Sequence, residues 1–308
     1  MPEHFSFIPL PDQARPPADP PEGYRLQRAG ENGYVVIAGI AQSAFVVTGD
    51  GVIVVDAPPA IGDKLTAAIA SVTDKPVTHF IYTHSHLDHV GSTTQFGDVT
   101  RIAHAECAEL LAVHGDPDRP APQQTISGER TVLTIGGERV ELIYPGPNHE
   151  VGNILVWFPA QRLAIMTDVV MPGWAPYRGW GNADFPPGML AAHDAILALD
   201  FETYVGGHVY RTGTRADVQT SREFFVDLWL TTQKQMGTVS YADAMAEAEP
   251  ANAWAAQAVY MQRIGAAVTD ELVDRWSDRL AGVDTFTRAT AESAVVSIST
   301  DAPRDFPS

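Results

Sequence analysis

Short apolar runs separated by glycine- and aspartate-containing turns dominate the first two-thirds of the chain. Runs rich in β-branched and aromatic residues predict buried strands, here at residues 34–37, 44–48, 52–55, 77–82, 136–143, 153–158 and 164–166. The turn at residues 49–51, Gly-Asp-Gly, supplies the positive φ that a tight hairpin needs. Apolar spacings of three and four predict helices at residues 61–71 and 104–114 and another near Val90. Interleaved strands and helices of this kind indicate an α/β protein.

Helical patterns take over from Arg215 onward. Residues 251–280 carry one apolar stripe at helical spacing, formed by Trp254, Ala258, Met261, Gly265, Val268, Leu272, Trp276 and Leu280. Such a stripe has to be buried, so this tail is expected to pack on the main domain or on a second copy of the chain, as a homodimer. At the other end, five prolines within residues 10–23 hold an extended arm. This arm is expected to lie over the domain or over a partner.

Composition and charge narrow the classes of partner. A formal net charge of −18, with only three lysines, would repel a phosphate backbone, so nucleic acid is not expected as a partner. No stretch approaches eighteen consecutive apolar residues, and the first residues lack the basic and apolar segments of a signal peptide. We therefore expect a cytoplasmic protein that does not engage a membrane. The single cysteine, Cys107, lies in a helical context and is expected to be buried and unreactive.

One stretch, directly after the strand at residues 77–82, carries the chemistry. Thr83-His84-Ser85-His86-Leu87-Asp88-His89 places three imidazoles and a carboxylate within six positions, which core packing does not explain. A ligand set of imidazole nitrogen and carboxylate oxygen is typical of zinc sites, and it fits iron or manganese less well. His84 and His86 can point the same way from an extended segment, whereas Asp88 and His89 begin the next turn. This arrangement favours two metals over one.

The pattern His-x-His-x-Asp-His after an apolar strand resembles the signature of the metallo-β-lactamase superfamily. His149, Asp168 and His208 follow in the order and context of the family pattern, so the resemblance covers roughly residues 30–232. It implies a four-layer αββα sandwich that brings the ligand loops to one edge. It also implies that one Zn²⁺ is held by His84, His86 and His149, a second by Asp88, His89 and His208, and that Asp168 bridges them. The expected division is an arm at residues 1–23, a catalytic domain at residues 24–235 and a helical extension at residues 236–308.

The ligand set predicts hydrolysis. Two divalent cations that share a water lower its pKa from 15.7 to about 7 or less, so a metal-bridged hydroxide could attack, with Asp88 as ligand and proton shuttle. Within the family, a bridging aspartate is typical of lactonases and glyoxalase II-like thioesterases. We therefore predict a dinuclear zinc hydrolase for an ester, lactone or thioester. The alternatives are a β-lactamase-type hydrolase of cyclic amides, an iron oxidoreductase similar to the persulfide dioxygenases, and a metal-stabilised binding protein without turnover.

Several other residues are candidates for the surroundings of the predicted metals. Residues 171–182 combine two tryptophans and a tyrosine with glycine and proline, and either wall an apolar substrate pocket or fold onto the C-terminal helices. The candidate contacts to a small, partly apolar substrate are Trp174, Tyr177, Arg178, Trp180, Asn153 and Tyr210. Asp56 ends a strand and is either a local cap or a group that orients a ligand histidine. The remaining histidines, expected to bind no metal, are His4, His79, His104, His114 and His193.

Overall fold

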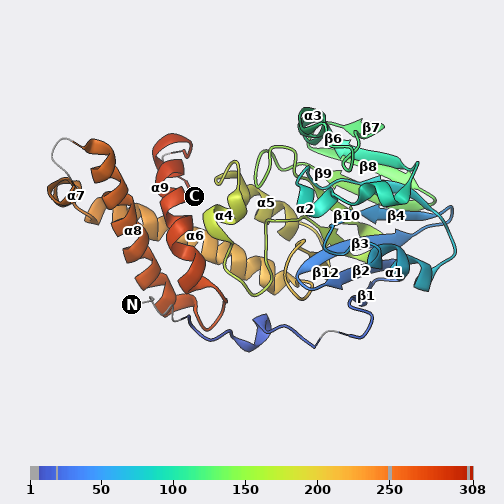
Figure 1. Cartoon of the computed structure of the whole chain (residues 1–308), viewed down its shortest axis with the longest axis horizontal. Helices are drawn as coiled ribbons and strands as arrows, with labels where there is room; N and C mark the ends of the chain where they lie inside the picture. The colour runs from blue at the N-terminus through green and yellow to red at the C-terminus, as the bar shows by residue number, and fades with distance from the viewer. Residues whose placement is uncertain (1–6, 19, 249–251, 304–305, 308) are drawn as a thin grey trace.

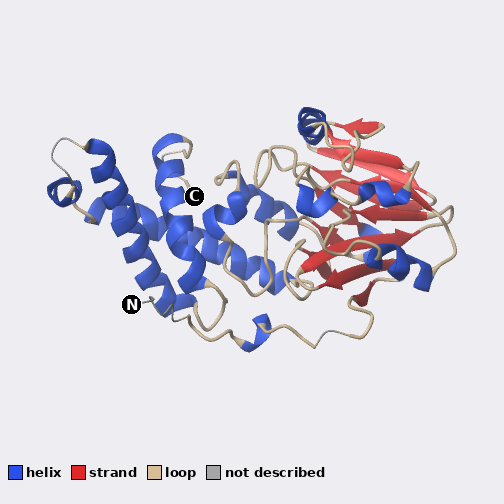
Figure 2. Cartoon of the chain, in the orientation of Figure 1, coloured by secondary structure: helices blue, strands red, loops and turns tan. Residues whose placement is uncertain are grey.

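Two β-sheets lie at one end of the molecule and a group of long helices at the other (Figures 1 and 2). The computed structural model describes residues 7–18, 20–248, 252–303 and 306–307. In this part of the chain, no helix is long and apolar enough to cross a membrane.

The first sheet has seven strands in chain order. They are β1 (Arg25–Ala29), β2 (Gly33–Ala38), β3 (Ala41–Val47), β4 (Val52–Val55), β5 (Val77–Ile81), β6 (Thr100–His104) and β7 (Gln124–Ile126). Strands β1 to β4 pair antiparallel, whereas β4 to β7 pair parallel. Parallel neighbours need crossover connections, which contain α1 (Lys64–Val72) before β5 and α3 (Ala105–His114) before β7. Between β5 and β6 lie the single turn α2 (Leu87–Val90), which ends where a helix was expected to start, and the short 3₁₀ helix η2 (Thr93–Phe96).

The second sheet has five strands in the order β12-β11-β10-β9-β8. They are β8 (Arg130–Ile135), β9 (Glu138–Ile143), β10 (Leu155–Phe158), β11 (Leu163–Ile165) and β12 (Thr203–Val205). The strands pair antiparallel except β11 with β12, which pair parallel. The connection between these two includes α4 (Arg178–Asn182) and α5 (Gly188–Leu197), and η3 (Pro159–Gln161) joins β10 to β11.

Three apolar cores separate four layers. Alternate residues of both sheets, such as Val35 and Val156, form the core between the sheets. A second core lies on the outer face of the first sheet, where Leu65 of α1 and Leu111 of α3 pack. The third lies on the outer face of the second sheet, beneath α5 and the C-terminal helices. The predicted αββα sandwich with a C-terminal helical region is therefore confirmed. Cys107 is buried in the second core, as expected, and burial raises the pKa of its thiol.

The C-terminal helices are α6 (Arg215–Thr238), α7 (Tyr241–Glu247), α8 (Ala253–Trp276) and α9 (Val283–Thr300). The predicted apolar stripe is buried against this chain's own core only from its middle onward, at Val268, Leu272, Trp276 and Leu280. Its beginning does not pack on the main domain of the same chain, since Trp254 is 85% exposed. Burial of this part against a second copy of the chain stays a prediction. The first turns of α8 extend past the sandwich and lie beside the short helix α7 (Figure 1).

The proline-rich arm runs from the C-terminal helices to β1 (Figure 1). It contains the single turn η1 (Asp12–Ala14). The backbone N–H of Ile8 donates to the Asp284 carboxylate at 2.8 Å. The side-chain amide of Gln13 donates to the carbonyl of Arg279 at 3.0 Å. The arm therefore contacts the turn between α8 and α9 and the first residues of α9.

Candidate metal centre

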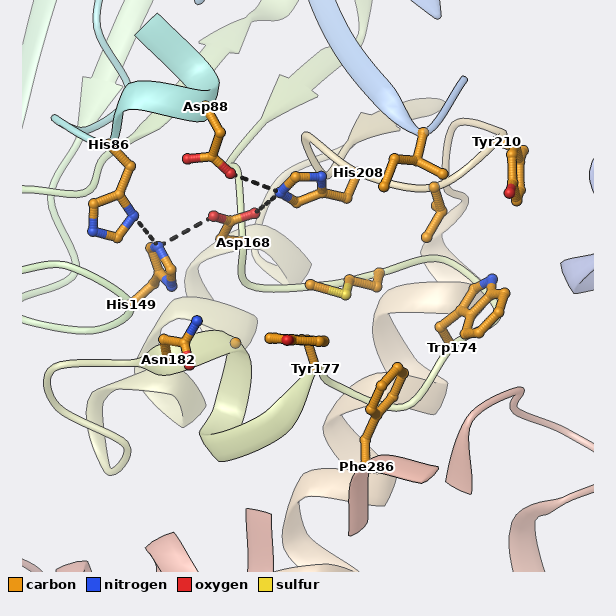
Figure 3. Close-up of a pocket in the computed structure, with 14 residues that line it drawn as sticks. His86, Asp88, His149, Asp168, Trp174, Tyr177, Asn182, His208, Tyr210 and Phe286 are labelled. Atoms are coloured by element: carbon orange, nitrogen blue, oxygen red, sulfur yellow. Dashed lines mark hydrogen bonds and ion pairs between the residues drawn. The ribbon is translucent and has the colours of Figure 1, made fainter. Parts of the chain in front are cut away.

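The segments that carry the predicted ligands meet at one edge of the two sheets. His84 and His86 follow the end of β5, and Asp88 and His89 belong to α2. His149 lies in the loop between β9 and β10, whereas Asp168 and His208 follow the ends of β11 and β12. Figure 3 shows five of these side chains around one end of a pocket. The fold thus brings together residues that lie far apart in the sequence.

Four of the side chains form the first ligand group. Ligand atoms of His84, His86, His149 and Asp168 all lie within 4.8 Å of one another. The Nε2 atom of His149 lies 3.0 Å from Nδ1 of His86 and 3.2 Å from Oδ2 of Asp168. The Nε2 atom of His84 lies 3.8 Å from the same carboxylate oxygen.

Asp88, His89 and His208 form the second ligand group. The Nε2 atoms of the two histidines are 3.1 Å apart, and each lies 3.6 Å from Oδ2 of Asp88. Asp168 reaches this group as well, because its Oδ2 lies 3.1 Å from His89 and its Oδ1 lies 3.2 Å from His208. The carboxylate of Asp168 thus lies between two sets of imidazoles.

Burial and the neighbouring carboxylates shift the pKa values of these imidazoles in opposite directions. Burial lowers the pKa of His84, His86 and His208, so their rings are neutral at pH 7 and carry free lone pairs. Burial would also lower the pKa of His89, but the carboxylates of Asp168, Asp56 and Asp88 outweigh it and raise this pKa to about 9.

For Asp168, burial opposes ionisation, yet the imidazoles of His89 and His149 hold its pKa well below the usual range. The buried Nε2 of His84 has no hydrogen-bond partner within the described residues. A buried nitrogen of this kind, among lone pairs about 3 Å apart, is the arrangement expected of metal ligands. The donor set of imidazole nitrogen and carboxylate oxygen therefore fits one divalent cation in each ligand group.

Asp56 supports His84 through a threonine. Its carboxylate accepts the backbone N–H of Thr83 at 2.9 Å and the hydroxyl of the same residue at 2.7 Å. That hydroxyl lies 2.9 Å from Nδ1 of His84. Asp56 is buried, which raises its pKa to about 6. Asp56 therefore has both expected roles. It accepts the backbone N–H of Thr83 locally, and through the Thr83 hydroxyl it contacts the candidate ligand His84 indirectly.

Glu150 is a buried carboxylate beside His86 that the sequence reasoning missed. It accepts hydrogen bonds from the hydroxyl of Ser85 at 2.6 Å and from the backbone N–H of Ser85 at 3.0 Å. Its Oε1 also lies 3.6 Å from Nε2 of His86, the ring nitrogen that faces away from the ligand group. A carboxylate in this position orients a ligand imidazole. The sequence signal that could have identified Glu150 is its position directly after the predicted ligand His149.

A pocket of about 420 Å³ opens beside the two ligand groups. Three of the predicted substrate contacts, Trp174, Tyr177 and Tyr210, line it. Phe286 lines it too and was not predicted, because it lies more than a hundred residues from Trp174 and Tyr177 in sequence. Trp180 was placed wrongly: it is 1% exposed and packs in the core, with its ring centroid 4.4 Å from that of Phe225.

Two further candidates lie outside the pocket lining. Asn153 is buried, and its amide donates to the side chain of Asn148 and to the carbonyl of Thr167, both at 3.0 Å. It therefore ties the His149 loop to the strand end that precedes Asp168. Arg178 is exposed at the start of α4 and is not among the pocket residues.

The other described histidines lie outside both ligand groups. His193 is buried in α5, with Nδ1 donating to the Met189 carbonyl and Nε2 lying 3.0 Å from the Ser221 hydroxyl. His79, His104 and His114 belong to neither ligand group. His4 lies outside the described residues.

Comparisons with known proteins agree with this geometry. The sequence model of the family described as "Metallo-beta-lactamase superfamily" matches residues 37–208. The chain is 33% identical over 191 residues to 2,4-dinitroanisole O-demethylase subunit alpha of Nocardioides sp. (strain JS1661), covering 59% of this chain and 56% of that protein. It is 30% identical over 140 residues to a metallo-beta-lactamase type 2 of Bacillus cereus, covering 43% and 52%. The chain thus spans little more than half the length of these relatives.

The fold is also shared with solved structures. A metallo-beta-lactamase from Pontibacter korlensis superposes with a TM-score of 0.56 at 19% identity, covering 66% of this chain and 98% of that one. At this identity, the likeness concerns the fold alone. Because the family model spans more than half of the chain and contains all seven ligand residues, this protein belongs to the metallo-β-lactamase superfamily.

Proposed function

We propose that the protein is a hydrolase that uses two divalent cations, of which Zn²⁺ is the preferred ion, to cleave an ester, lactone or thioester with water. The observation that carries this proposal is the position of Asp168, whose carboxylate lies between two groups of imidazoles at the end of a pocket. When bound there, divalent cations would supply a water of lowered pKa and polarise a substrate carbonyl. No serine or cysteine nucleophile is needed.

The chain's own residues have distinct tasks in this proposal. His84, His86 and His149 would hold one cation, while Asp88, His89 and His208 would hold the other, with Asp168 shared between them. Asp88 has the most exposed side chain among the carboxylates of the centre, at 64%, and it lines the pocket. It can therefore hold a proton and deliver it to the departing oxygen or sulfur. Tyr177 and Tyr210 can donate hydrogen bonds to the substrate from the same pocket.

A second candidate function is the cleavage of an aryl ether by water. It is favoured by the likeness to a protein named for the O-demethylation of 2,4-dinitroanisole, an aromatic methyl ether. Aromatic side chains in the pocket wall suit a ring of this kind. Water would cleave such an ether to a phenol and an alcohol, without an electron donor or acceptor.

The test is a panel of substrates offered to metal-depleted protein and to the same protein after addition of Zn²⁺. The panel contains a nitrophenyl ester, an acyl-homoserine lactone, a thioester, nitrocefin, a phosphodiester and 2,4-dinitroanisole. We expect zinc-dependent hydrolysis of an ester, lactone or thioester, lowered at least about a hundredfold in Asp168→Ala and retained in the variant of an exposed histidine, His114→Ala. Activity that depends on iron and consumes oxygen, or the absence of turnover on the whole panel, would contradict the hydrolase.

A further inference from the structure

The C-terminal helices contribute a wall to the pocket beside the candidate metal centre. Phe286 lies in the first turn of α9 and lines the pocket together with Trp174 and Tyr177. The ring centroids of Phe286 and Tyr177 are 5.3 Å apart, with an angle of 63° between the rings. Figure 3 shows the three aromatic side chains on the side of the pocket away from His86. We call Trp174, Tyr177 and Phe286 the aromatic wall.

The aromatic wall is fixed by the backbone. Residues 173–175 form an isolated bridge with Ala281, in which Ala175 donates to the Ala281 carbonyl and Ala281 donates to the Gly173 carbonyl, both at 2.9 Å. Gly282 follows with φ of 72°, and a Cβ atom there would lie 3.3 Å from Cε3 of Trp174. The loop after β11 and the start of α9 are therefore held together, and the wall is formed before any substrate binds.

The pocket has no cationic side chain among the residues that the structure describes. Its polar groups beyond the metal ligands are the neutral side chains of Tyr177, Asn182 and Tyr210. A carboxylate or phosphate at the far end of a substrate would therefore lie beside aromatic rings without a cationic partner, which is unfavourable. An uncharged ring would instead stack or make edge contacts there.

Arginines nearby do not change this conclusion. Arg15, Arg25 and Arg211 line an adjoining hollow, which is lined in part by the N-terminal arm and shares Trp174, Val209 and Tyr210 with the pocket. Arg25 donates to the carbonyl of Tyr210, and Arg15 pairs with Asp12. Arg211 pairs with Asp217 at 2.6 Å. Each guanidinium is thus already engaged outside the pocket.

From this arrangement, and resting on the proposed hydrolase function, we infer that the site takes an uncharged substrate whose non-reacting part is an aromatic ring. The ring lies against the aromatic wall while the bond to be cleaved faces the ligand groups. Phe286 is then a specificity-determining residue that the C-terminal helices add to the metal site of the sandwich.

Three esters test the inference in the zinc-loaded protein. They are phenyl acetate, which is neutral and aromatic, ethyl acetate, which has no ring, and 4-acetoxybenzoate, which carries a carboxylate on the ring. We expect kcat/KM for phenyl acetate to exceed that for 4-acetoxybenzoate by about tenfold or more. Phe286→Ala should lower kcat/KM for phenyl acetate about tenfold and leave that for ethyl acetate within about twofold. Phe286→Arg should reverse the preference towards 4-acetoxybenzoate.

The matched control is Val296→Ala, which alters a half-exposed apolar residue of the same helix and should change none of the three rates. Equal losses on phenyl and ethyl acetate in Phe286→Ala, or an unchanged preference in Phe286→Arg, would overturn the inference. Binding of 2-naphthol, measured by calorimetry, separates this result from failure of the hydrolase proposal because it needs no turnover. Phe286→Ala should weaken that binding about tenfold, and unchanged binding would also overturn the inference.

Discussion

Asp168 is the residue on which both groups of imidazoles converge, and its backbone has a φ of 64°. Aspartate tolerates this left-handed conformation better than most side chains. Val209, directly after His208, has a φ of 71°, which is costly for a β-branched residue. The side-chain amide of Gln42 donates to the Val209 carbonyl at 2.8 Å and to that of Arg211 at the same distance. This buried amide fixes the strained segment that carries the candidate metal ligand His208.

The indirect contact of Asp56 with His84 predicts a loss of metal affinity without loss of the fold. Asp56→Asn replaces one of the two acceptor oxygens that hold Thr83 with an NH₂ group, so His84 loses its fixed orientation. We expect the affinity for Zn²⁺, measured by competition with a chromophoric chelator, to fall about 10–100-fold. Asp63→Asn, an exposed residue ahead of α1, is the control. An unchanged affinity in folded Asp56→Asn would show that this contact has no part in binding.

His193 predicts a pH dependence of stability that is separate from the candidate metal centre. Burial lowers its pKa from 6.5 to about 4, so below pH 6.5 the unfolded chain takes up a proton that the folded protein does not. The free energy of unfolding that neutral His193 contributes is fully present above pH 6.5, and it is lost progressively as the pH falls from 6.5 through about 4. The loss at pH 5 is about 2 kcal/mol.

Urea unfolding at pH 7 and pH 5 measures this difference. In His193→Gln the difference between the two pH values should shrink by about 2 kcal/mol, whereas the exposed-site variant His114→Gln should match the parent protein. The same pH difference in His193→Gln and in the parent protein would show that His193 does not titrate as described.

The loop after β11 has two separate structural roles. Its first part, at Trp174 and Tyr177, lines the pocket. Its second part, α4, places Trp180 in the core against Phe225 and Trp229 of α6. The two roles considered for residues 171–182, pocket wall and packing on the C-terminal helices, are thus divided between adjacent parts of one loop. Composition could not divide them, because tryptophan suits both an apolar pocket and a core.

Trp180→Ala tests this division. Removing a buried tryptophan leaves a cavity, so we expect the free energy of unfolding to fall by about 3–5 kcal/mol. Trp254→Ala, at a side chain that is 85% exposed, should cost less than about 0.5 kcal/mol. Denaturant unfolding gives both values. Unchanged stability in Trp180→Ala, together with a raised KM, would instead support a place in the pocket wall.

For the whole molecule, sequence patterns predicted seven strands, β2 to β5 and β9 to β11, because their side chains carry a continuous apolar signal. They missed β6, β8 and β12, which also face apolar cores but whose apolar residues are interrupted by polar ones or form runs of only two. Strands β1 and β7 lie at the edges of the first sheet and have polar, exposed residues, so no such signal marked them. The seven ligand residues were recognisable because local spacing and chain order carry the family pattern. The contacts of Glu150 and Phe286 could not be predicted, since they depend on how distant segments meet: the His149 loop on the β5 loop, and α9 on the loop after β11.

We propose that the two ligand groups, joined by Asp168, each hold a divalent cation. Calorimetric titration of metal-depleted protein with Zn²⁺ tests it most directly. We expect about two equivalents to bind per chain, about one in His208→Ala, and about two again in the exposed-site variant His114→Ala. Binding of fewer than two equivalents by the parent protein, or of two by His208→Ala, would contradict the claim.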